Sequence, residues 1–64
     1  MLTNEQRKVI KDECRMYIAN RESALRLWKE ARKSGDKATE KVANRMFIEY
    51  GERLETVRRL ARKL

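Results

Sequence analysis

Residues 32–37, with the sequence RKSGDK, form the only break between two long periodic segments, and this break decides the fold. Gly35 can adopt the left-handed conformation that ends a helix. Asp36 can accept hydrogen bonds from the free N–H groups at the start of a second helix. Arg32 and Lys33 suit the negative end of the dipole of the preceding helix. The stretch therefore predicts one helix ending before residue 34 and another beginning at residue 37.

The segments on either side predict a helix over residues 4–33, a turn over 34–36 and a helix over 37–62. Thr3 followed three residues later by Gln6 matches a capping box at the start of the first helix. A turn this short makes consecutive helices antiparallel, so facing residues should have numbers that add up to about 70. Residues 1–64 are thus expected to be a single all-α domain, an antiparallel helical hairpin.

Apolar residues at alternating steps of three and four define the seam along which the two helices should pack. In the second helix the series is Ala43, Phe47, Tyr50, Leu54, Val57, Ala61 and Leu64. In the first helix it is Ile10, Cys14, Tyr17, Arg21, Ala24, Trp28 and Ala31.

Two residues depart from the seam pattern. Because an unpaired buried charge is costly, Arg21 is expected to pair with or stack on its predicted neighbours Glu49 and Tyr50. A charged seam residue that fixes the register or the oligomeric state is the alternative. Gly51 lowers helix stability by about 1 kcal/mol relative to alanine. Either close approach of the helices or a local bend would explain its presence.

A second apolar stripe on the first helix consists of Val9, Met16 and Leu27. It lies about 100° around the helix from the seam, so a single neighbouring helix does not cover it. Contiguous exposed apolar surface usually marks an interface. We therefore expect a homodimer in which two hairpins form a four-helix bundle through these three residues. Docking of one hairpin on a different protein is the alternative.

The composition disfavours catalysis. The chain has no histidine, and no glycine-rich phosphate loop, nucleophile elbow or zinc-ligand spacing is present. The single cysteine, Cys14, lies on the seam and is expected to be a small buried hydrophobe. Acidic residues lie four positions from basic ones, as on a solvated helix face. We expect no enzymatic activity, no metal, no cofactor and no small-molecule substrate.

The chain is strongly basic, with 17 Lys and Arg against 10 Asp and Glu and a net charge of +7. The excess is spread over both halves, as either polyanion binding or solubility would allow. Candidate nucleic-acid contacts are Lys41, Arg45, Arg58, Arg59, Arg62 and Lys63. Glu49 and Glu52, in or beside the same side of the helix, would repel a phosphate backbone.

These patterns together favour a small non-enzymatic regulatory or adaptor protein that acts through protein–protein binding as a homo-oligomer. An accessory nucleic-acid-binding protein that uses a basic helix face is the alternative. With one cysteine and no apolar segment of membrane-spanning length, a cytoplasmic location and no membrane contact are expected.

Overall fold

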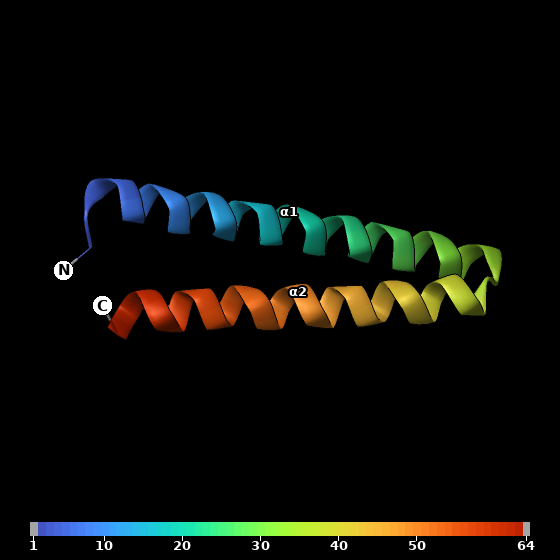
Figure 1. Ribbon diagram of the computed structural model, residues 1–64. Helices are drawn as coiled ribbons and strands as arrows, with labels where there is room; N and C mark the ends of the chain where they lie inside the picture. Colours follow the sequence, from blue (N-terminus) through green and yellow to red (C-terminus); the bar gives the residue numbers. More distant parts are fainter. Residues whose placement is uncertain (1, 64) are drawn as a thin grey trace.

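The structure, a computed structural model, describes residues 2–63 and consists of two antiparallel helices (Figure 1). Helix α1 spans Asn4–Ser34 and helix α2 spans Lys37–Lys63. The prediction of an all-helical hairpin is confirmed. Each helix runs one residue further than the sequence pattern suggested, a difference within the usual uncertainty of helix ends. Leu64, the last predicted seam residue, lies outside the described residues.

A capping box begins α1, as predicted. The Gln6 backbone N–H donates to the Thr3 hydroxyl oxygen at 3.1 Å, and the Thr3 backbone N–H donates to the Gln6 side-chain oxygen at 2.9 Å. Because the first N–H groups of a helix have no partner within the helix, this reciprocal pair fixes the point at which α1 starts.

The turn between the helices also has the predicted chemistry. Gly35 adopts φ 76° and ψ 15°, and its N–H donates to the carbonyl of Arg32 at 3.4 Å. The N–H of Asp36 donates to the carbonyl of Ala31 at 2.9 Å, which completes a Schellman motif. The Asp36 carboxylate accepts from the backbone N–H of Thr39 at 3.1 Å and from the Thr39 hydroxyl. One residue thus ends α1 and the next caps α2.

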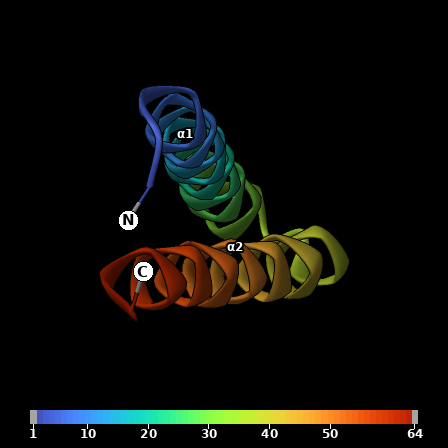
Figure 2. The ribbon, with the colours of Figure 1, turned by 60° about the vertical axis from the view of Figure 1, so that its left-hand side comes forward.

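The fully buried side chains within residues 2–63 are few and mostly small: Ala24, Ala31, Ala43 and Leu54. The three alanines lie in the halves of the helices nearer the turn, where small side chains allow the backbones to approach. Both views show the helices close together at the turn and further apart toward the two termini (Figures 1 and 2). The hairpin is therefore packed most closely at its turn end.

Contacts between the helices follow the expected register. The rings of Tyr17 and Tyr50 lie with centroids 6.4 Å apart, and the Arg21 guanidinium lies 5.9 Å from the centroid of the Phe47 ring. The Arg21 side chain also runs beside Gly51. Facing residues in these pairs have numbers that add up to about 70, as a three-residue turn requires.

Candidate interaction surface

The predicted stripe on α1 is exposed in the hairpin. Val9, Met16 and Leu27 are between 38 and 61% exposed, although each has a large apolar side chain. Their place about 100° from the seam points them away from α2. Whether they form an interface stays a prediction, but the surface itself is present.

Helix α2 adds two residues to the same face, Val42 and Leu60, which are 51 and 56% exposed. Each lies about 100° around α2 from the seam residues Ala43 and Ala61. The two sides of the hairpin are distinguished by a groove that Leu25 of α1 and Asn44 of α2 line together.

Leu25 lies on the opposite flank of the seam from Met16, and Asn44 on the opposite flank from Val42. Leu25 and Asn44 lie on one side of the hairpin. The flank of α1 that carries Met16 and the flank of α2 that carries Val42 therefore lie together on the other side. The exposed apolar residues of that side, hereafter the apolar face, are Val9, Met16, Leu27, Val42 and Leu60. Of the six large apolar residues exposed within residues 2–63, only Ile48 lies elsewhere.

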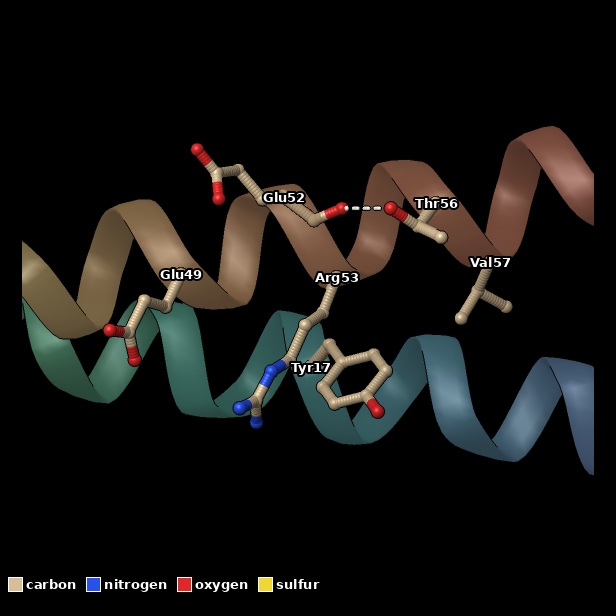
Figure 3. A pocket seen from close by; sticks show the side chains of 6 residues that line it. All are labelled: Tyr17, Glu49, Glu52, Arg53, Thr56 and Val57. Carbon is tan, nitrogen blue, oxygen red and sulfur yellow. Dashed lines mark hydrogen bonds between the residues drawn. The ribbon is translucent and has the colours of Figure 1, made fainter.

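A shallow groove in the middle of the apolar face is lined mostly by polar and charged side chains (Figure 3). Arg53 extends from α2 toward α1 beside Tyr17, and its guanidinium lies 5.9 Å from the ring of Tyr50. A hydrogen bond with the Glu13 carboxylate raises the pKa of Tyr17, with partial burial in the same direction. Charged and polar groups thus lie at the centre of the face beside Met16, while Val9, Leu27, Val42 and Leu60 lie toward its ends.

The six candidate nucleic-acid contacts are all exposed, but the structure does not place them together. Lys41, Arg45, Arg59 and Lys63 lie along the outward side of α2. Arg58 lies on the flank opposite the apolar face, where it lines a groove with Arg21. The Nε of Arg62 donates to the carbonyl of Arg58 at 3.4 Å, so this pair belongs to the other flank. Four of the six thus form one strip.

Arg21 stacks on an aromatic ring, as predicted, but the ring is that of Phe47 and not that of the predicted neighbour Tyr50. The Tyr50 ring instead lies against Tyr17 and Arg53, on the opposite flank of the seam. At Gly51, an added Cβ would meet the Arg21 side chain at 3.8 Å, an ordinary contact. Close approach of the helix backbones therefore does not explain this glycine.

Three features of the described residues bear on metal binding, on Cys14 and on membrane spanning. Residues 2–63 contain no group of three or more His, Cys, Asp or Glu side chains placed to hold a metal. Cys14 is half-buried and not fully buried as expected. In the same residues, neither helix combines the length and the apolar character that crossing a membrane requires.

Sequence reasoning did not assign Val42 or Leu60 to this surface. The signal that identifies them is the direction in which each residue is rotated around its helix from the seam. On two antiparallel helices, residues rotated from the seam by the same angle in the same direction lie on the same side of the hairpin. No family model matches the sequence, and neither the curated proteins nor the solved structures provide a match.

Proposed function

We propose that this chain is a small, non-enzymatic regulatory or adaptor protein of the cytoplasm that acts through protein–protein binding as a homo-oligomer. The observation that supports it is the apolar face, which gathers five large exposed apolar side chains from both helices on one side of the hairpin. Exposed apolar surface on this scale usually marks an interface. Only four residues are buried within residues 2–63, and a chain of 64 residues with so small a core usually needs a partner for stability.

Replacement of Met16 by glutamate tests the proposal. Because the charge would have to be buried in the interface, we expect Met16→Glu to yield a monomer or an unfolded chain. Sedimentation equilibrium measures the mass, and circular dichroism separates the two outcomes.

Ile48→Glu is the matched control. Ile48 is 50% exposed and Met16 is 48% exposed, but Ile48 lies away from the apolar face. Its substitution should leave the oligomer unchanged. An oligomer that survives Met16→Glu, or a wild-type chain that is monomeric at high concentration, contradicts the proposal.

A second candidate function, nucleic-acid binding, is favoured by the exposed strip of Lys41, Arg45, Arg59 and Lys63. Each phosphate neutralised by such a strip adds a salt-dependent increment to the affinity. Titration with DNA and RNA at low and moderate salt tests it. Tight binding that falls steeply with salt supports this function, and no binding at low salt rules it out.

A further inference from the structure

The side of the hairpin opposite the apolar face, hereafter the groove side, is hollowed near the turn. A groove with a volume of about 320 Å³ lies between Trp28 of α1 and Lys37, Lys41 and Asn44 of α2. Trp28 and Asn44 also line a smaller groove of about 130 Å³, which reaches Phe47. The two grooves therefore adjoin, and the Trp28 indole is a wall of both.

A third groove continues along the groove side toward the open end. It is lined by Arg21 of α1 and Arg58 of α2. Arg21 connects it with the second groove, because the Arg21 guanidinium lies over the Phe47 ring. From Lys37 to Arg58 the three grooves extend over about 30 Å of α2. Together they form one elongated track.

The aromatic rings along this track accept flat cationic groups. The Arg32 guanidinium lies 5.2 Å from the centroid of the Trp28 ring, and the Arg21 guanidinium lies 5.9 Å from that of Phe47. Arg32 is exposed and Trp28 is half-buried, so this face of the indole is reached from solvent and is not packed against α2. A guanidinium is planar, and the place that it takes over the indole also suits a nucleic-acid base.

The charge around Trp28 is mainly positive. Arg32 lies over the ring, and Lys37 and Lys41 line its larger groove. Glu40 is the one acidic residue that lines the same groove. On α1, the charged residues within about 90° of the seam on the groove side are all basic: Arg7, Arg21 and Arg32. The site therefore attracts a negatively charged ligand.

The positive excess is greatest at the turn end of the track. In the third groove, Glu52 and Glu55 lie beside Arg21 and Arg58 and offset their charge. The Trp28 indole and the stronger positive charge thus occur at the same end, where one ligand can contact both.

A ligand that carries both a flat ring and a negative charge matches this combination. Single-stranded nucleic acid has both in every nucleotide, since its base is free to stack and its phosphate is charged. A duplex offers the phosphates, but its bases are stacked inside and do not reach the indole. An acidic peptide offers charge without the ring. The chemistry of the site therefore favours a single strand.

We infer that the groove side binds single-stranded nucleic acid, with one base stacked on Trp28 and the adjoining phosphates beside Arg32, Lys37 and Lys41. From there the strand continues past Phe47. At a stacked spacing of about 3.4 Å per nucleotide, the track of about 30 Å holds roughly nine nucleotides. This inference rests on the second candidate function, nucleic-acid binding, and names its ligand. It does not depend on the apolar face, which lies on the other side of the hairpin.

The first test uses the fluorescence of Trp28, which is the only tryptophan of the chain. At low salt, a single strand of ten nucleotides should bind and quench the emission, because a base stacks on the indole. A duplex of ten base pairs and polyglutamate should not quench it. A free mononucleotide should bind at least a hundredfold more weakly than the strand, because it lacks the neighbouring phosphates.

The other outcomes separate this inference from the function on which it rests. Binding of both strand and duplex without quenching overturns the inference and leaves nucleic-acid binding to the outward basic residues of α2. Equal quenching by polyglutamate, by the duplex or by the mononucleotide at the same concentration also overturns it. If neither strand nor duplex binds at low salt, both are wrong.

The second test removes two of the cations beside Trp28. Arg32→Gln with Lys37→Gln should weaken binding of the strand about tenfold at low salt. It should also reduce the slope of log affinity against log salt by about 1.4, since each phosphate contact of a single strand contributes about 0.7.

Arg15→Gln with Arg26→Gln is the matched control. It removes the same charge from exposed positions on the outward side of α1 and should leave both quantities unchanged. Circular dichroism shows whether each variant keeps its helices. Equal weakening by both pairs of substitutions, or none by the first, contradicts the placement of the strand at Trp28.

Discussion

Gly51 lies inside α2, where glycine lowers helix stability and where this structure gives it no compensating role. An added Cβ would meet only the flexible Arg21 side chain, at an ordinary distance of 3.8 Å. We therefore expect Gly51→Ala to raise the free energy of unfolding by about 0.5–1 kcal/mol, as the lower backbone entropy of alanine in the unfolded chain predicts. Urea denaturation followed by circular dichroism measures the change. A destabilised variant would show that the helices need this gap.

Arg21 shows why a charged residue is tolerated on the seam. Its aliphatic stem passes Gly51, and its guanidinium lies over the Phe47 ring, so apolar surface is covered while the charged end stays partly in water. The sequence was sufficient to predict stacking on an aromatic ring. It could not select the ring, since Phe47 and Tyr50 are three residues apart and lie on opposite flanks of the seam.

At the scale of the elements, Asp36 couples the start of α2 to pH. Hydrogen bonds from the Thr39 hydroxyl and backbone N–H hold the pKa of Asp36 below its ordinary value of 3.8. Because the folded-state pKa is the lower one, the ionised cap stabilises the hairpin above pH 3.8 and this contribution is lost as the pH falls through the folded-state pKa.

Comparison of the wild-type chain with Asp36→Asn isolates this contribution, because asparagine also caps a helix but does not titrate. We expect the difference between their melting temperatures to be constant near neutral pH and to shrink below about pH 4. Thermal melts followed by circular dichroism measure it. An unchanged difference down to pH 2 would mean that the Asp36 carboxylate contributes nothing to the cap.

At the scale of the whole molecule, the hairpin has too little core for its length. In the part of the chain that the structure describes, three of the four buried side chains are alanines, and five large apolar residues remain on one exposed face. If a second copy covers that face, folding is linked to association, and the folded state gains stability with concentration. We expect the melting temperature to rise by several degrees over about a hundredfold increase in concentration. The Met16→Glu variant should show no such dependence, and a wild-type melt independent of concentration would indicate a self-sufficient hairpin.

Much of this architecture was predictable from local features of the sequence. The capping box at Thr3, the left-handed Gly35 and the Asp36 cap each depend on a few adjacent residues, so short-range chemistry determines them. The exposure of Val9, Met16 and Leu27 also follows from helix periodicity alone. The angle between this stripe and the seam is a property of a single helix and does not change when the second helix packs.

The composition of the apolar face depended on the tertiary structure. Val42 and Leu60 join the stripe of α1 only because the two helices run in opposite directions, which places equal offsets from the seam on one side of the hairpin. The choice of Phe47 under Arg21 has the same origin. Periodicity determines which residues share a face of one helix, but only the packing of both helices determines which faces meet.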